Sequence, residues 1–235
     1  MARIVELSPV FADAGSTDHL YVNGIWNARQ PTEDLARQRG HSYLRPPGGG
    51  VSTDAWRALL AGADAVILAP TTAGPGGMQQ PADGEEAGRI IGQRLLDGLR
   101  ASRLGVHVVL VSHFLVGHGR SHRNAKASTW SLHALEAHLR GGQNPWTILR
   151  PTWLSTIHDP SYQTRLSPDR YADGLVSTES VAAAVVTAIE HPEVSAGRTA
   201  AIFSLSIPET GHTDLAAQFA AIEPDLEAGR AVVSS

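Results

Sequence analysis

The sequence contains no cysteine and only one lysine, Lys126, among its 235 residues. The absence of cysteine excludes disulfide bonds, thiolate metal sites and cysteine nucleophiles. No apolar run approaches the roughly 20 residues that span a bilayer, and Glu6 interrupts the N-terminus where a signal peptide is uniformly apolar. We therefore expect a cytoplasmic protein with no membrane segment.

An excess of positive charge is also missing. The formal net charge is −4 and the isoelectric point is about 6.2, whereas a protein that binds nucleic acid electrostatically usually carries a basic face. We expect no nucleic-acid partner. Hydrophobic residues make up 42% of the sequence and charged residues 18%, which is ordinary for a globular protein whose length suits one domain.

Short apolar runs alternate with segments of helical periodicity along most of the chain. The strand candidates are residues 4–7, 19–23, 42–45, 63–69, 106–111, 146–150 and 199–205. The helix candidates are residues 31–40, 53–61, 85–101, 124–140, 178–191 and 214–222. This alternation predicts a three-layer α/β fold of the Rossmann type, a doubly wound parallel sheet in a single domain. The polar tail, residues 223–235, is expected to be loosely held.

Four segments, in the correct order, resemble parts of the atypical short-chain dehydrogenase/reductases and the NmrA-like proteins. They are Gly62–Ala69, Val108–Ser112, Trp146–Pro151 and Ser177–Val185. The first three are similar to the fourth, fifth and sixth strands of that family, and the last is similar to the helix start that follows its substrate segment. The resemblance covers the chain from about Tyr21 to Leu205 and implies an NAD(P)-binding Rossmann domain.

The cofactor end departs from the family pattern. The family has Gly-x-x-Gly-x-x-Gly after its first strand, so that the backbone can approach the pyrophosphate. If that strand is 19–23, Gly24 is the one glycine that remains, and Asn27 stands at the second position. This alignment leaves residues 1–18 as an N-terminal addition without an assigned role. We prefer it, because a first strand at 4–7 puts a long loop where a tight turn belongs.

The resemblance implies further contacts with the cofactor. Arg45 ends the second strand candidate, where the family often holds an arginine that pairs with a 2′-phosphate, so NADP is the expected cofactor. An ordinary surface arginine is the alternative. Thr71 begins a loop that resembles the family's Asn-Asn-Ala-Gly loop. Ala69 and Pro151, each at the end of a strand, are the remaining contacts that the resemblance implies.

The catalytic tyrosine of the family has no counterpart at the expected spacing. The family places a serine after its fifth strand and a tyrosine four residues before a lysine. Here Ser112 ends that strand, and His122 precedes Lys126 by four residues, which brings both side chains to one face of a helix. A nearby ammonium group lowers the pKa of an imidazole, so His122 favours the role of hydrogen-bond donor or base. These three residues are the candidate catalytic set.

Aromatic residues and histidines follow the fifth and sixth strands. Residues 152–176 correspond to the substrate segment of the family. The expected pocket residues are His113, Trp153, His158 and Tyr162, which give an aromatic, weakly polar lining suited to a planar organic ligand; ordinary core packing is the alternative. The histidines match no metal-binding motif, and we expect no metal.

Three functions compete. The fold, with Ser112, Lys126 and Arg45, favours an NAD(P)-dependent oxidoreductase or isomerase that acts on a small carbonyl, quinone or polyketide-like substrate. The missing glycines and tyrosine favour a cofactor-independent cyclase, dehydratase or isomerase of specialised metabolism that uses the vacated cleft. Loss of the tyrosine also permits a non-catalytic NmrA-like sensor. We expect the first function, with a small-molecule substrate, and a homo-oligomer is consistent with the family.

Overall fold

Strands and helices alternate along a computed structural model of the chain, which describes residues 1–6, 23–45, 58–69, 93, 99, 105–118, 127–155, 157–205 and 213–225. Its strands are β1 (Arg3–Glu6), β2 (Ser42–Leu44), β3 (Ala65–Leu68), β4 (His107–Val111), β5 (Trp146–Pro151), β6 (Trp153–Ser155), β7 (Thr164–Ser167), β8 (Leu175–Ser177) and β9 (Arg198–Ser204). Its helices are α1 (Asn23–Gln38), α4 (Leu115–His118), α5 (Ala127–Arg140), α6 (Thr178–Glu190), α7 (Pro192–Ser195) and α8 (Leu215–Ala221). None of the helices in these ranges is long and apolar enough to cross a membrane.

The strands form one sheet in the order β2-β1-β3-β4-β5-β9-β8-β6, with β7 antiparallel to β9. Neighbours from β2 to β9 are parallel, and β8 pairs antiparallel with β9. The chain order reverses at β1, because β2 lies on one side of it and β3 on the other. This reversal is the switch point of a doubly wound sheet, and it confirms the predicted fold class.

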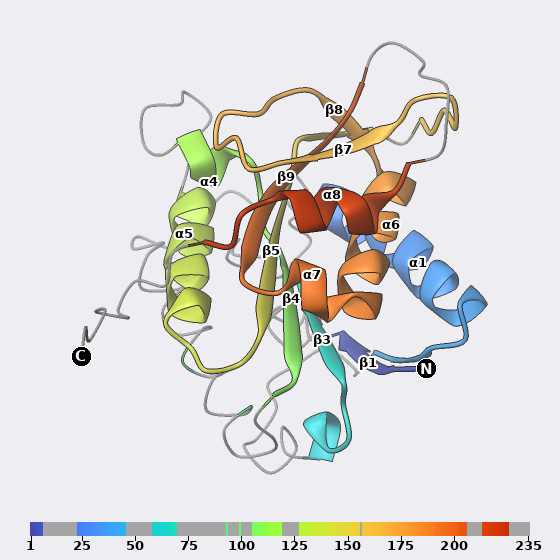
Figure 1. The fold of residues 1–235 in the computed structure, drawn as a ribbon, viewed down its shortest axis with the longest axis vertical. Coiled ribbons are helices and arrows are strands. Elements are labelled where there is room, and N and C mark those ends of the chain that lie inside the picture. The colour runs from blue at the N-terminus through green and yellow to red at the C-terminus, as the bar shows by residue number, and fades with distance from the viewer. Residues whose placement is uncertain are drawn as a thin grey trace.

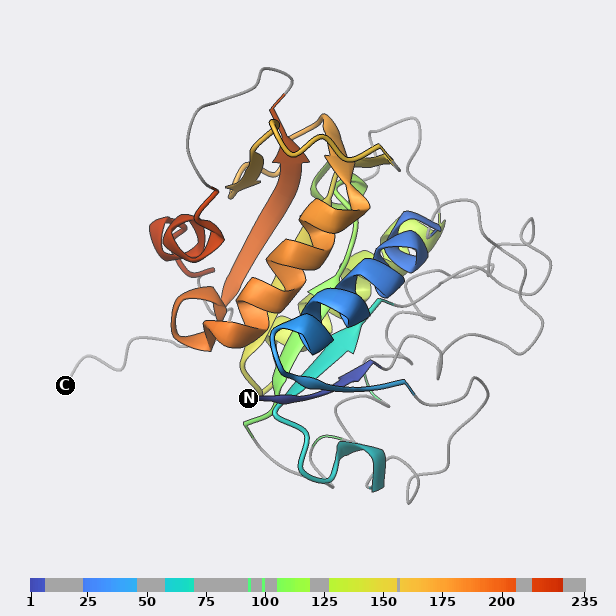
Figure 2. The ribbon, with the colours of Figure 1, turned by 90° about the vertical axis from the view of Figure 1, so that its right-hand side faces the viewer.

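Helices cover both faces of the sheet. α1 and α6 lie side by side on one face, and α5 lies on the opposite face (Figures 1 and 2). The buried strand residues alternate between two cores accordingly. Ala65 and Ile67 of β3 pack in the core with α1 and α6, whereas Val66 and Leu68 pack in the core with α5. Burial on both faces explains the continuous apolar runs of the central strands.

The N-terminal run is the first strand, which corrects the preferred alignment. β1 is parallel to both β2 and β3, and its Ile4 lies beside Tyr43 and Ala65. Ile4 and Val5 are completely buried. A strand buried on both faces needs apolar residues in succession, and Ile4-Val5 meets that need between β2 and β3. Residues 3–6 are therefore part of the core, although we assigned them to an N-terminal addition.

Helix α1 begins earlier than predicted, at Asn23. Gly24 and Asn27 therefore lie in its first turns, and their contacts with a cofactor stay predictions. Pro31 lies inside the helix and not in its first turn. A proline cannot donate a backbone hydrogen bond, and next to it the hydroxyl of Thr32 donates to the carbonyl of Ala28 at 2.6 Å.

The other predicted core strands are confirmed at 42–44, 65–68, 107–111, 146–151 and 198–204. Helix α6 starts where predicted because Ser177 caps it, its hydroxyl accepting from the backbone N–H of Ser180. The short strands β6, β7 and β8 were not predicted. They form the part of the sheet beyond β9, inside and around the expected substrate segment.

Candidate active site at the carboxyl edge of the sheet

The carboxyl ends of the parallel strands meet at one edge of the sheet, where open α/β sheets bind ligands. Three groups of side chains lie along this edge. The first surrounds Glu6 at the end of β1, and the second follows β4 and β5. The third surrounds a cavity beyond β9. The three groups follow one another along the edge, from the switch point outward.

A buried carboxylate dominates the end of β1. Glu6 is 3% exposed, and it accepts from Arg29 Nε at 2.9 Å and from Tyr43 Oη at 3.2 Å. Arg45 Nε lies 3.6 Å from Glu6, and Arg45 also pairs with Glu33 of α1. We call Glu6, Arg29, Glu33, Tyr43 and Arg45 the Glu6 cluster. Arg45, the expected ligand of a 2′-phosphate, is thus at the predicted strand end, where two carboxylates already engage it.

Burial shifts the pKa values of two members of this cluster, Tyr43 and Arg29. It raises the pKa of Tyr43 far above its ordinary value, and the adjacent Glu6 carboxylate adds to the rise. Burial also lowers the pKa of Arg29, against the attraction of Glu6. Tyr43 therefore stays protonated and remains a donor to Glu6 throughout the physiological pH range.

A small cavity of 20 Å³ lies against this cluster, lined among others by Glu6, Arg29 and Ala69. That is room for about one water molecule. Ala69 was an expected cofactor contact, and it follows β3 at the switch point. Thr71, another expected contact, lies outside the described residues.

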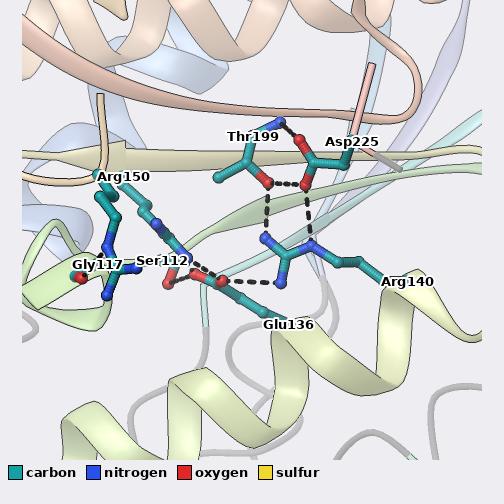
Figure 3. Close-up of polar contacts among 8 residues, drawn as sticks. Ser112, Gly117, Glu136, Arg140, Arg150, Thr199 and Asp225 are labelled. Atoms are coloured by element: carbon teal, nitrogen blue, oxygen red, sulfur yellow. Dashed lines mark hydrogen bonds and ion pairs between the residues drawn. The ribbon is translucent and has the colours of Figure 1, made fainter. Parts of the chain in front are cut away.

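A second buried carboxylate lies under the middle of the edge (Figure 3). Glu136 of α5 is completely buried, and it accepts from the Ser112 hydroxyl at 2.6 Å. Arg150 at the end of β5 donates to both carboxylate oxygens, at 3.0 and 2.5 Å. Arg140, one turn further along α5, donates to the same carboxylate at 3.2 Å. The carboxylate thereby joins α5 to the ends of β4 and β5.

The same network extends to the C-terminal segment. Arg140 donates to Asp225 at 2.9 Å and to Thr199 at 2.7 Å, and the Thr199 hydroxyl donates to Asp225 at 2.7 Å. We call Ser112, Glu136, Arg140, Arg150, Thr199 and Asp225 the Glu136 network. Asp225 belongs to the tail that we expected to be loosely held. Its hydrogen bonds to Arg140 and Thr199 show that the packed part of the chain extends at least to this residue.

The three candidate catalytic residues differ in what the structure says of them. Ser112 does lie at the end of the predicted strand, but its hydroxyl is 0% exposed and donates to Glu136. The Ser112 hydroxyl therefore faces Glu136 and not solvent, and its catalytic role stays a prediction. His122 and Lys126 lie outside the described residues, and their roles stay predictions.

The residues that follow β4 and β5 are aromatic. His113 and Trp153 are partly exposed and pack edge to face at 6.1 Å between ring centroids. Phe114 is buried between them, at 4.8 Å from His113 and 5.0 Å from Trp153. His113 Nδ1 accepts from the backbone N–H of Leu115 at 3.2 Å. The neutral His113 ring therefore carries its proton on Nε2.

Pro151 joins these two strand ends. Its carbonyl accepts from the backbone N–H of Phe114 at 3.2 Å, so the segment after β4 is fixed against the end of β5. Further along, His118 of α4 packs edge to face on Phe114 at 5.6 Å and on Tyr171 at 5.5 Å. The aromatic residues after the two strands form one connected group.

A cavity of 680 Å³ lies beyond β9 and near the ends of β6 and β8. Its lining comprises Ser155, Ile157, His158, Asp159, Tyr162, Asp173, Gly174, Leu175, Val176, Ser177, Ser180, Phe203, Ser204 and Leu205. Two of the expected pocket residues, His158 and Tyr162, line it. The other two, His113 and Trp153, lie instead in the aromatic group. Within the described ranges, no three side chains of the metal-binding types form a cluster.

Several residues of the site were not predicted. Glu136 precedes Arg140 by four residues, and this i, i+4 spacing was a visible signal of an ion pair on one helix. Asp159, Asp173 and Ser177 carry no comparable signal, because loops and a short strand bring them to the cavity. Glu6 was missed because its strand was misassigned.

The topology and the charged, switch-point end of this edge define a Rossmann-type protein with the architecture of a dinucleotide-binding domain. The chain belongs to the family described as NAD(P)H-binding, whose model matches residues 30–192. The predicted relationship to NAD(P)-binding proteins is thus confirmed. No curated protein matches the chain significantly.

Solved structures share the fold at low sequence identity. An oxidoreductase, ylbE, from Lactococcus lactis is 13% identical with a TM-score of 0.63, over 92% of this chain and 94% of the other. A wide-type short-chain dehydrogenase/reductase from Veillonella parvula in complex with NADP is 14% identical with a TM-score of 0.53, over 88% and 96%. ChuY, an anaerobilin reductase from Escherichia coli O157:H7, is 15% identical with a TM-score of 0.54, over 89% and 100%.

The family implies a nicotinamide dinucleotide, and the donor set at the switch point fits one. Arg29 and Arg45 bring two guanidinium groups to the ends of β1 and β2, and guanidinium groups bind phosphate oxygens in bidentate geometry. Arg45 is 33% exposed and can be reached from solvent. These two residues would hold phosphate groups of the cofactor.

Proposed function

We propose that the protein is an NADPH-dependent reductase that acts on a small, planar carbonyl or quinone compound. The observation that carries this proposal is the placement of His113 and Trp153. They follow β4 and β5, on the edge that carries the Glu6 cluster at one end and the 680 Å³ cavity at the other. A ligand between these two regions meets an aromatic wall and an imidazole donor.

His113 takes the place of the missing tyrosine in this proposal. A reduced nicotinamide, when bound, supplies a hydride. The Nε2–H of His113 donates a hydrogen bond to the carbonyl oxygen of the substrate and stabilises the negative charge that develops on it. Water then supplies the proton that completes the alcohol. A donor of this kind contributes roughly a hundredfold to a thousandfold in rate.

The choice of NADPH rests on the cations of the Glu6 cluster. Arg45 directly follows β2, the strand whose end lies beside the adenosine ribose in dinucleotide-binding sheets. The internal pairing of Arg45 with Glu6 and Glu33 is the observation that most favours the cofactor-independent alternative, because the same carboxylates leave less free charge for a phosphate.

Titration of the protein with NADPH and NADH by calorimetry, followed by turnover on a panel of carbonyl compounds and quinones, tests the proposal. His113→Phe keeps the aromatic packing and removes the donor, so kcat is expected to fall about a hundredfold or more. The affinity for NADPH should change by about twofold or less, because the residue does not contact the nucleotide end. His133→Phe, at an exposed position of α5, is the matched control.

Two results would contradict the proposal at different points. An unchanged kcat in His113→Phe would remove His113 from the site and leave the reductase function intact. Failure to bind either dinucleotide at millimolar concentration would remove the reductase itself and favour the cofactor-independent enzyme.

A further inference from the structure

We propose that the 680 Å³ cavity selects apolar molecules that are neutral or cationic and carry hydrogen-bond donors, and that it rejects carboxylates. The proposal rests on the proposed function only in taking this cavity as the substrate side of the site. Two independent features of the described lining support it: its size and walls, and its charge.

The size and walls suit a small organic molecule. The volume lies within the range of about 300 to 1,000 Å³ that is typical of ligand pockets. Ile157, Leu175, Val176, Phe203 and Leu205 supply apolar surface. Leu175 and Ile157 are 61% and 80% exposed, which is unfavourable for such side chains in water. A bound apolar molecule would cover them.

The charge of the described lining is negative. Asp159 and Asp173 contribute carboxylates, and neither lysine nor arginine is among the described lining residues. The Ser161 hydroxyl and backbone N–H donate to Asp159 at 2.6 and 2.9 Å and lower the pKa of its carboxyl group. Glu179 adds a third carboxylate, 4.0 Å from His158 Nδ1. A ligand with its own carboxylate would be repelled here.

Hydroxyl groups hold the His158 ring at the cavity. His158 Nδ1 lies 2.8 Å from Ser177 Oγ. Ser177 Oγ accepts from the backbone N–H of Ser180 and lies 3.0 Å from Ser180 Oγ, which in turn lies 2.7 Å from Thr164 Oγ1. These contacts fix the ring beside the carboxylates of the lining.

The charged groups of the described lining are therefore acceptors. The carboxylates of Asp159 and Asp173 accept from a ligand, whereas the hydroxyl groups of Tyr162 and of the lining serines both donate and accept. A phenol, an amide N–H or an ammonium group satisfies such acceptors, whereas a carboxylate ligand would leave them unpaired and add like charge. Unpaired acceptors and like charges together account for the selectivity.

Three naphthalene probes that differ in one substituent test this inference. Binding of 2-(aminomethyl)naphthalene, 2-naphthol and 2-naphthoate is measured by calorimetry at neutral pH and low salt. We expect the amine to bind about tenfold or more tightly than the carboxylate, with the phenol between them. Raised salt should reduce the difference between the two charged probes, because their discrimination is electrostatic.

The double variant Asp159→Asn/Asp173→Asn should reduce the ratio between amine and carboxylate to about threefold or less. Asparagine keeps the Oδ1 atoms that accept from Ser161 and Gly174, so the loops retain their hydrogen bonds. Asp169→Asn is the matched control, since Asp169 accepts from Tyr171 in the same segment but does not line the cavity; its ratio should equal that of the unaltered protein.

Equal affinity for the amine and the carboxylate, a ratio that the double variant does not change, or no binding of any probe would overturn the inference. Dinucleotide titration of the same protein separates this result from the reductase proposal. Ranked probe binding without dinucleotide binding refutes only the reductase, and dinucleotide binding with unranked probes refutes only the selectivity.

Discussion

Two buried carboxylates, Glu136 and Glu6, support different ends of the site in different ways. The main partner of Glu136, Arg150, is 13% exposed, and its second partner, Arg140, is 24% exposed. Glu6 is nearly as buried, but its partner Arg45 is 33% exposed, and Arg45 is linked through Glu33 to the still more exposed Arg37. The Glu136 network is therefore built for stability, whereas the Glu6 cluster can rearrange when an anion arrives from solvent.

The largest difference should appear in stability. Glu136→Gln removes the charge that compensates Arg150 and Arg140, and breaking a buried ion pair in this way costs about 3–5 kcal/mol. Glu6→Gln removes the partner of Arg29, which is 16% exposed, but the guanidinium group of Arg45 can turn toward water. We therefore expect this variant to lose less stability than Glu136→Gln. Urea unfolding measured on both variants checks the comparison, and an equal loss in Glu6→Gln would break it.

Glu190→Gln is the control for that measurement. Glu190 pairs with Arg39 at 2.5 Å and with His41 at 3.0 Å, and its partner Arg39 is 40% exposed. Exposed pairs contribute about 1 kcal/mol or less. A larger loss in this variant would show that the charge of any carboxylate, and not its burial, determines the effect.

A third buried group, His107, should make the stability of the protein depend on pH. His107 of β4 is 4% exposed and lies 2.9 Å from Thr147. Burial lowers its pKa from 6.5 to about 4. The folded protein therefore disfavours the proton that the unfolded chain binds, so stability is fully present above pH 6.5 and is lost as the pH falls toward 4. The loss amounts to about 3 kcal/mol.

His107→Val removes this titration and places a β-branched residue, which suits a strand, at the same position. The unfolding free energy of the variant should be nearly constant over the same interval, measured by urea unfolding at a series of pH values. An unchanged slope would show that His107 is not the source of the acid sensitivity.

The sheet was predictable because its strands are buried on both faces. Residues 65–68, 107–111 and 146–151 form runs with few interruptions, and such runs carry a strong signal. The first strand was misassigned although its apolar run was visible. Its four residues lacked a recognisable glycine turn after them, and the family pattern gave more weight to the glycine at position 24.

The site was less predictable because its groups come from distant segments. His158 and Tyr162, predicted because residues 152–176 resemble the substrate segment of the family, do line the cavity; their contact with a substrate stays a prediction. Ser112 was found at the correct strand end, but its partner Glu136, which is 24 residues away, decides that its hydroxyl points inward. Such a contact depends on how α5 packs on the sheet, and local sequence does not encode that packing.

The smallest effect should be a gain of affinity in the Glu6 cluster. Glu33 pairs with both Arg45 and Arg37, so its carboxylate competes with a 2′-phosphate for Arg45. Glu33→Gln removes this competitor, and the affinity for NADPH and for 2′,5′-ADP should rise about fivefold, equivalent to about 1 kcal/mol. The affinity for NADH, which lacks the 2′-phosphate, should change by about twofold or less.

Asp34→Asn is the matched control for Glu33→Gln. Asp34 is the next residue on α1 and accepts from Gln30 at 2.8 Å, so the variant removes one negative charge without altering the pairing of Arg45. Equal gains in both variants would reduce the effect to net charge. A gain confined to Glu33→Gln would mean that Arg45 can exchange an internal carboxylate for a ligand, which is the property that distinguishes the Glu6 cluster from the Glu136 network.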